Sequence, residues 1–234
     1  MASPRFKVER EQFRDIEISA YFFPEDLHLA RTYIERAAKY LDMYEKSLGP
    51  YAYRRFAMAE NFLPTGLSMP TFTLLGQEVL RLPFIPEISL GHEILHQWFG
   101  NLVYIDFDRG NWAEGLTTYL ADHFYEEQKG NGWAYRKRAL LDYQSYVHGK
   151  NEMSLRDFQG RTDPASKAIG YGKALMVFHM LKNWVGDQVF RESLGDFVRE
   201  MRFRKASWAD IQRIFEHRSA NWASGACNFL LLDL

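Results

Sequence analysis

The chain has 234 residues, of which 47% are apolar and 25% charged, the composition of a soluble globular protein with room for a full hydrophobic core. Its 29 basic and 30 acidic residues leave a net charge of −1, which excludes the basic surface of a typical nucleic-acid-binding protein. The single cysteine, Cys227, excludes a disulfide framework and a cysteine-rich metal site. There is no run of about 18 apolar residues, and the first residues lack the apolar stretch of a signal peptide. We therefore expect a soluble domain without a membrane segment, and the sequence leaves its compartment open.

The N-terminal part of the chain carries the signals of strands around one long helix. Polar and apolar side chains alternate in the first segment, as they do in a half-buried strand. Apolar residues at spacings of three and four follow, and Gly49-Pro50 ends that helical pattern. The predicted elements are a strand at 15–23, an amphipathic helix at 27–48, and strands at 53–63 and 69–75.

The rest of the chain is predicted to be mostly helical. Asp163-Pro164 is a typical helix start, and Ser207-Trp208-Ala209-Asp210 resembles a capping box. The predicted helices cover 86–101, 112–130, 132–147 and 164–186, with one more from Asp187 and a short last one after Ser207. Strands followed by helices predict an α+β fold that is predominantly helical, with a small N-terminal β region. We see no internal repeat and no flexible linker, so one compact domain is the simplest interpretation.

The strongest chemical signal is the segment His92-Glu93-Ile94-Leu95-His96 inside a predicted helix. Residues four apart leave the same helix face, so both imidazoles can bind one small cation. Glu93 lies beside them and could accept a proton from the attacking water. The alternative is a pair of exposed helix histidines. The apolar residues around the motif, such as Trp98 and Phe99, favour a buried helix, and buried histidines need partners.

A catalytic zinc site needs three protein ligands, so one more must come from outside this motif. Glu114 begins the next predicted helix, and a helix–loop–helix path can return its carboxylate to the same face. A glutamate at a helix start is otherwise a surface charge that complements the helix dipole. Beside the histidine motif, and flanked by Trp112, the ligand interpretation is favoured.

These residues resemble a known family. The run from His92 to Val103, which continues Gln-Trp-Phe-Gly-Asn-Leu-Val after His96, resembles the signature of the gluzincin zinc peptidases of the alanyl-aminopeptidase type, peptidase family M1. Trp112-Ala113-Glu114-Gly115 resembles that family's second zinc motif, with one residue fewer than usual between His96 and Glu114. The resemblance implies a thermolysin-like catalytic domain that binds one zinc ion per chain through His92, His96 and Glu114.

A third segment extends the resemblance. Tyr171-Gly172-Lys173-Ala174 resembles the family's Tyr-x-Lys-Gly segment, with alanine in place of the glycine. The resemblance implies that Tyr171 donates a hydrogen bond to the tetrahedral intermediate. A phenol placed there would stabilise charge that exists only in the transition state. The alternative is a tyrosine that simply packs in an apolar helix.

The residue that would bind a substrate's free α-amino group is less clear from the sequence. The family carries Gly-x-Met-Glu-Asn on an edge strand, and the best match is Ala57-Met58-Ala59-Glu60-Asn61. This register makes Glu60 the substrate-binding carboxylate. A competing register places Gly66-Leu67-Ser68-Met69 on that strand, with no carboxylate at all. Exopeptidase character depends on the choice between them.

The resemblance covers about residues 25–217 and corresponds to the catalytic domain only. We expect residues 1–23 to contribute an N-terminal strand, as the remnant of an upstream β-sandwich, residues 24–217 to form the catalytic domain, and 218–234 to be a divergent tail. The predicted function is a zinc metallopeptidase, and more specifically an aminopeptidase acting on peptides, with no nucleic-acid partner. Two alternatives stay open: a zinc-binding structural or interaction domain without turnover, and a hydrolase of a non-peptide substrate on the same site.

Overall fold

The computed structural model describes residues 5–62 and 66–219. The chain divides into two compact units, Met1–Leu102 and Val103–Leu234, called here the N-terminal unit and the C-terminal unit. The N-terminal unit contains the main sheet, and the C-terminal unit is almost entirely helical. The predicted class, α+β and predominantly helical with a small N-terminal β region, is confirmed. The tail at 218–234 lies outside the described residues except for Arg218 and Ser219.

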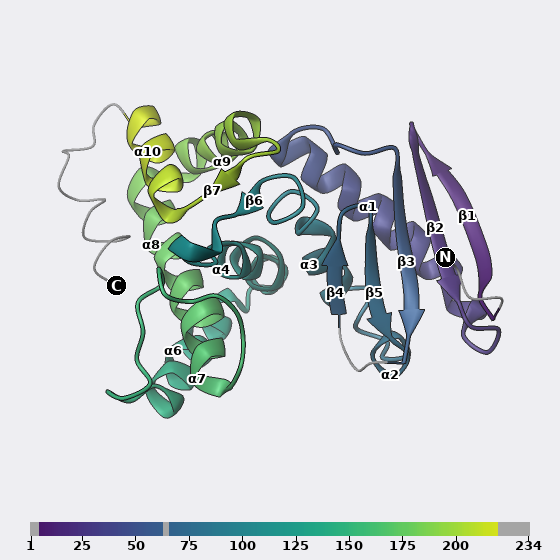
Figure 1. The fold of residues 1–234 in the computed structure, drawn as a ribbon, viewed down its shortest axis with the longest axis horizontal. Coiled ribbons are helices and arrows are strands. Elements are labelled where there is room, and N and C mark those ends of the chain that lie inside the picture. The colour runs from purple at the N-terminus through teal and green to yellow at the C-terminus, as the bar shows by residue number, and fades with distance from the viewer. Residues whose placement is uncertain (1–4, 63–65, 220–234) are drawn as a thin grey trace. The chain divides into compact units, whose positions relative to one another are not determined.

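The N-terminal unit is built on a five-stranded sheet in the order β1-β2-β3-β5-β4 (Figure 1). Strands β2, β3 and β5 are parallel to their neighbours within that group, and the two edge strands β1 and β4 pair antiparallel to β2 and β5. The strands are β1 (Lys7–Phe13), β2 (Ile16–Phe22), β3 (Arg55–Asn61), β4 (Gly66–Met69) and β5 (Phe72–Gly76). The side chains of β2 that point to the core are fully buried, in agreement with the predicted alternation.

The sheet differs from the sequence prediction in two places. Strand β1 was not predicted, because most of its residues are exposed and polar and it lacks the apolar alternation that marks a buried strand. It gives β2 a second neighbour besides β3. The predicted strand at 69–75 is instead part of a hairpin, since the chain turns at Thr71, whose φ is 73°.

The helices of the N-terminal unit hold the motif helix against the sheet. Helix α1 packs on β2 and also contacts α3. The Tyr44 hydroxyl donates to the carbonyl of Gly91 in α3 at 3.0 Å, and the Tyr33 hydroxyl donates to the Leu80 carbonyl at 2.8 Å. The helices are η1 (Leu27–Leu29), α1 (Ala30–Leu48), α2 (Gln77–Leu80) and α3 (Ser89–Leu95). Helix α3 is shorter than the predicted 86–101, because the backbone tightens after Leu95 and turns at Gly100, whose φ is 120°.

Two of the long helices in the C-terminal unit contain a π-helical segment. The predicted helix at 112–130 is α4 (Ala113–Thr118), η3 (Tyr119–His123) and α5 (Phe124–Gln128). The predicted helix at 164–186 is α7 (Pro164–Lys167), η4 (Ala168–Lys173) and α8 (Ala174–Val185). Each π segment widens one turn of an otherwise α-helical rod, a feature that is frequent at functional sites.

The remaining elements complete this unit, and the predicted caps are present. Asp163 accepts a hydrogen bond from the Ser166 backbone at 2.8 Å, and the Ser207 backbone donates to Asp210 at 2.9 Å, so both helix starts are fixed. These elements are β6 (Tyr104–Ile105), η2 (Phe107–Arg109), α6 (Gly132–Tyr146), α9 (Asp187–Met201), β7 (Lys205–Ala206) and α10 (Trp208–Arg218). Among the described residues, no helix has the length and apolar character needed to cross a membrane.

Candidate metal and catalytic residues

The two motif histidines face each other at the C-terminal end of α3. The Nε2 atoms of His92 and His96 are 3.2 Å apart. The other ring nitrogen of His96, Nδ1, lies 2.9 Å from the Phe99 carbonyl, which can accept its proton, so that Nε2 carries the lone pair with which a metal ion would be bound. Both side chains are half-buried, so the pair is shielded but reachable.

This pair fits a zinc ion. Two imidazole nitrogens bound to tetrahedral zinc at roughly 2.0–2.1 Å lie about 3.3 Å apart. The observed separation of 3.2 Å between the Nε2 atoms matches that spacing. A second-sphere carbonyl on the far nitrogen, as Phe99 provides for His96, is typical of zinc-binding histidines. The two half-buried rings could therefore bind one metal ion together, and they are not a pair of fully exposed histidines.

Glu93 lies against the edge strand β4. A Cβ on Gly66 would be 2.7 Å from Glu93 Oε1, so any other residue at this position would displace the carboxylate. The Ser68 hydroxyl donates to the Glu93 backbone carbonyl at 2.9 Å. The strand beside the motif helix is thus the segment Gly66–Met69, the one that the competing sequence register places on the family's edge strand.

Gln97 fixes this strand to α3, a role that the sequence prediction missed. Its side chain is buried, and its Nε2 donates to Ser68 Oγ at 2.8 Å and to the Met69 carbonyl at 2.9 Å. Its Oε1 accepts from the Thr71 backbone at 2.9 Å. Its place directly after His96 was visible in the sequence, but only the fold shows that its amide spans the β4–β5 turn.

Glu60 occupies a buried position on β3. Its side chain is 1% exposed, and Oε2 accepts a hydrogen bond from the Phe23 backbone at 2.7 Å. Burial and the neighbouring carboxylate of Asp26 raise the pKa of Glu60 to about 7. Arg81 binds Asp26 through two hydrogen bonds of 2.8 Å, which lower the pKa of Asp26.

These contacts bear on the predicted role of Glu60. A carboxylate that binds a substrate ammonium must be open to it, whereas this one is enclosed by its own sheet and by Asp26. The strand that reaches Glu93 is β4, not β3. The assignment of Glu60 as the substrate-binding residue stays a prediction, and its surroundings favour a structural role.

Glu114 lies in the C-terminal unit, in the first turn of α4. The start of this helix is held by the Trp112 indole, which is fully buried and donates to the Ala206 carbonyl at 2.7 Å. The Thr118 hydroxyl donates to the Glu114 backbone carbonyl at 2.7 Å one turn later. The Glu114 side chain is half-buried.

Tyr171 lies in the same unit, on the π segment η4. A Cβ on Gly115 would be 2.2 Å from Ala174 Cβ and 3.0 Å from the Gly170 carbonyl, so α4 and η4 pack at very close range. The Tyr171 ring meets the buried Phe158 ring edge-on, with centroids 6.2 Å apart. The C-terminal unit therefore brings Glu114 and Tyr171 onto adjacent helical turns and fixes both.

Comparison with known proteins points to one family. A family model described as "Peptidase family M1 domain" matches residues 88–227, more than half of the chain. The chain is 23% identical over 224 residues to human endoplasmic reticulum aminopeptidase 2, an alignment that covers 84% of this chain and 22% of that protein. It is 24% identical over 239 residues to glutamyl aminopeptidase of Bos taurus, with 91% and 24% covered.

A solved structure shares the fold. The M1 zinc metallopeptidase from Deinococcus radiodurans matches with a TM-score of 0.71 at 20% identity, covering 97% of this chain and 52% of that one. The chain thus spans about a quarter or less of these two curated relatives, and about half of the solved one.

Proposed function

Because the chain belongs to peptidase family M1, we propose that it is a zinc-dependent metallopeptidase of the aminopeptidase type. The observation that carries this proposal is the histidine pair, whose Nε2 atoms have the spacing of two zinc ligands and whose motif places Glu93 beside them. The thermolysin-like architecture predicted from the sequence is part of the proposal. Its support is the mixed sheet with an antiparallel edge strand next to the motif helix.

The proposed metal ligands are His92, His96 and Glu114, with one zinc ion per chain. Each offers one donor atom, two imidazole nitrogens and one carboxylate oxygen. Two histidines and one glutamate leave the fourth position open, as catalytic rather than structural zinc sites do. When bound, zinc supplies Lewis acidity that polarises the scissile carbonyl and makes water a nucleophile near neutral pH.

Two side chains of this protein would carry the proton and charge steps. Glu93 accepts a proton from the attacking water and later delivers it to the departing amine, as a general base and then a general acid. The absence of a side chain at Gly66 on β4 leaves room for this carboxylate, since a Cβ there would lie 2.7 Å from Glu93 Oε1. Tyr171 donates a hydrogen bond to the oxygen that becomes negative when the carbonyl is attacked. Both residues are unnecessary for holding a metal, which favours catalysis over a purely structural zinc domain.

Selection of a free N-terminus is the finer part of the proposal. The curated relatives are aminopeptidases by name. A buried α-ammonium group needs a carboxylate, because an unpaired charge taken from water costs several kcal/mol. The sequence predicts Glu60 for this contact, and the 1% exposure of Glu60 counts against that role.

The decisive experiment combines metal analysis with a panel of fluorogenic peptides that have free or acetylated N-termini. We expect about one zinc per chain, rapid cleavage of the free peptides only, and loss of cleavage in Glu93→Gln with zinc retained. The Glu60→Ala variant decides the anchor: a raised KM and a lowered kcat would support it. Zinc without turnover on any peptide would contradict the proposed function, and equal cleavage of both peptide classes would contradict the aminopeptidase part.

A further inference from the structure

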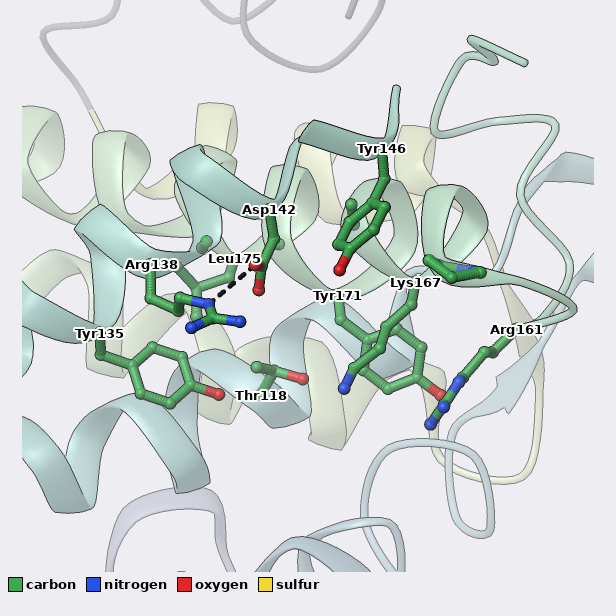
Figure 2. A pocket seen from close by; sticks show the side chains of 13 residues that line it. Thr118, Tyr135, Arg138, Asp142, Tyr146, Arg161, Lys167, Tyr171 and Leu175 are labelled. Atoms are coloured by element: carbon green, nitrogen blue, oxygen red, sulfur yellow. Dashed lines mark hydrogen bonds and ion pairs between the residues drawn. The ribbon is translucent and has the colours of Figure 1, made fainter. Parts of the chain in front are cut away.

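A cavity of about 390 Å³ lies within the C-terminal unit. Helix α6 forms one wall, and the rod that runs from α7 through η4 into α8 forms the other. Figure 2 shows its lining, in which the Tyr171 ring faces the same space as side chains from α6 and α7. Cavities of roughly 300–1,000 Å³ hold small ligands, so this one can accept a side chain or the end of a short peptide.

The lining of this cavity carries an excess of positive charge. Arg138 is paired, because its Nε donates to Asp142 Oδ1 at 2.8 Å, the contact drawn as a dashed line in Figure 2. Arg161 and Lys167 also line the cavity, and within the described part of the chain neither forms an ion pair. The cavity therefore presents two uncompensated cations, one on the loop before α7 and one on α7 itself.

The acidic residues nearby in the sequence do not line this space. Asp163, which lies between the two cations in the sequence, accepts hydrogen bonds from Ser166 and Thr162 as the cap of α7, and these lower its pKa. Glu152 accepts from the Tyr143 hydroxyl at 3.2 Å. Asp142 is the one carboxylate in the cavity lining, and Arg138 holds it.

Tyr171, one of the proposed catalytic residues, also lines this cavity. Its phenol is the group proposed to bind the oxygen of the tetrahedral intermediate, and its ring is held by Phe158. Figure 2 shows the ends of Lys167 and Arg161 on the part of the cavity where the Tyr171 ring lies. A ligand group that lies between the two cations would therefore be near the Tyr171 ring, in the same cavity.

We propose that this cavity binds a carboxylate of the peptide substrate between Arg161 and Lys167. The inference rests on the proposed function, because it concerns the substrate of the same enzyme. It states that the preferred substrates are peptides with an anionic group near the scissile bond. Charge-assisted hydrogen bonds from a guanidinium and an ammonium group recognise a carboxylate more strongly than a neutral amide of the same shape. The carboxylate is either an Asp or Glu side chain or the free C-terminus of a short peptide.

The first experiment compares peptides that differ only in that charge. A pentapeptide amide of alanine receives Glu or Gln at each position in turn, and di- and tripeptides of alanine are offered as acids and as amides. We expect at least one Glu/Gln pair or one acid/amide pair to differ by about tenfold in kcat/KM. The position of the effect identifies the source: an internal pair indicates a side chain, and the acid/amide pair indicates the C-terminus.

Charge variants of the cavity then test the assignment. The double variant Arg161→Gln with Lys167→Gln should abolish the preference while leaving kcat/KM for the neutral peptide within about twofold, because the neutral peptide does not use either cation. Lys167→Glu should reverse the preference towards a Lys-containing peptide. The matched control is Lys150→Gln, which removes an exposed positive charge of the same unit that does not line the cavity.

Binding provides a readout that does not need turnover. Calorimetric titration of the wild type should show tighter binding of Ala-Glu than of Ala-Gln, or of Ala-Ala than of its C-terminal amide, and the double variant should lose that difference. If no peptide is cleaved but this binding difference is present, the proposed function fails and the carboxylate site stands. Equal affinity and equal cleavage for charged and neutral peptides, or a preference that survives in the double variant, would overturn the inference.

Discussion

The two units bring their candidate residues together by different means. In the N-terminal unit, His92, Glu93 and His96 fall within two turns of one helix, so their relative positions follow from the helix geometry alone. In the C-terminal unit, Glu114 and Tyr171 are far apart in the sequence and meet because α4 and η4 pack through glycines. The candidate residues are thus positioned by local helix geometry in one unit and by tertiary packing in the other. We therefore expect mutations in the first unit to change mainly activity, and mutations at the packed glycine of the second unit to change mainly stability.

The largest effect is expected from removing a metal ligand. His96→Ala should lose zinc and reduce peptidase activity to background, because two remaining ligands bind zinc too weakly to hold it. Metal content by mass spectrometry and turnover of a free-amine fluorogenic peptide measure both losses. His148→Ala, at an exposed histidine, is the control and should keep its zinc. Full zinc occupancy in His96→Ala would contradict the ligand assignment.

In the C-terminal unit, Tyr171→Phe should leave zinc and stability unchanged and reduce kcat on the order of 10²–10³-fold, the effect of losing one oxyanion donor. Steady-state kinetics at saturating substrate, together with metal analysis, separate this outcome from a loss of metal. An unchanged kcat would mean that Tyr171 only packs against Phe158.

A single methyl group added on β4 should lower the catalytic rate. Gly66→Ala would place a Cβ 2.7 Å from Glu93 Oε1 and displace that carboxylate. Misplacing a catalytic group by about 1 Å costs roughly 10²-fold in rate, so kcat should fall by about that factor. Thermal unfolding should change little, because the carboxylate is the end of a flexible side chain. A rate within twofold of the wild type would show that Glu93 does not need this contact.

A methyl group added at Gly115 in the C-terminal unit should instead lower the free energy of unfolding. Gly115→Ala would place a Cβ 2.2 Å from Ala174 Cβ, between two backbones that cannot easily separate. Overpacking of this kind costs about 1–3 kcal/mol of unfolding free energy. The matched control is Gly195→Ala in α9, where nothing lies within 4 Å of the new Cβ and where alanine should stabilise the helix by about 0.5–1 kcal/mol. Denaturant unfolding of both variants measures the difference, and equal stabilities would refute the close packing of α4.

The last prediction concerns how stability depends on pH at Glu60, the buried acid of the sheet. The pKa of Glu60 is raised to about 7 in the folded protein, so the folded state binds its proton more tightly than the unfolded state does. This contribution to stability is complete at pH values below the ordinary glutamate pKa and is lost as pH rises towards 7, by at most about 1.4 kcal/mol per pH unit. Glu60→Gln, which cannot ionise, should flatten the fall. Unfolding curves between pH 4.5 and 8 measure it, and identical slopes would exclude Glu60 as the source.

What the sequence could predict follows the same division. The helix that contains the histidine motif and the two capping boxes depend on residues close together in the sequence, and the structure contains them. The strand beside Glu93 could not be identified, because two nearby segments fit a strand equally well and only pairing decides that Gly66–Met69 is the edge. Gln97 was missed for a similar reason: its partners Ser68, Met69 and Thr71 are more than 25 residues away in the sequence. Strand β1 was missed because an exposed edge strand needs no apolar pattern.

The π segments have a consequence for how chain length can vary. A π turn contains one residue more than the α turn it replaces, so η3 and η4 each behave as a stored one-residue insertion. In η4, the extra residue lies between two fixed points: the Asp163 cap at the start of α7, and Ala174, which packs closely against Gly115. Tyr171 lies between these two points, so the π turn affects the direction of its side chain. Deleting Gly172 would turn this segment into an ordinary α turn, which would leave α7 and α8 in register and change the direction only of the side chains within the turn, Tyr171 among them. Length changes in this rod therefore re-aim side chains without unfolding it, whereas the same change in a loop would leave them where they are.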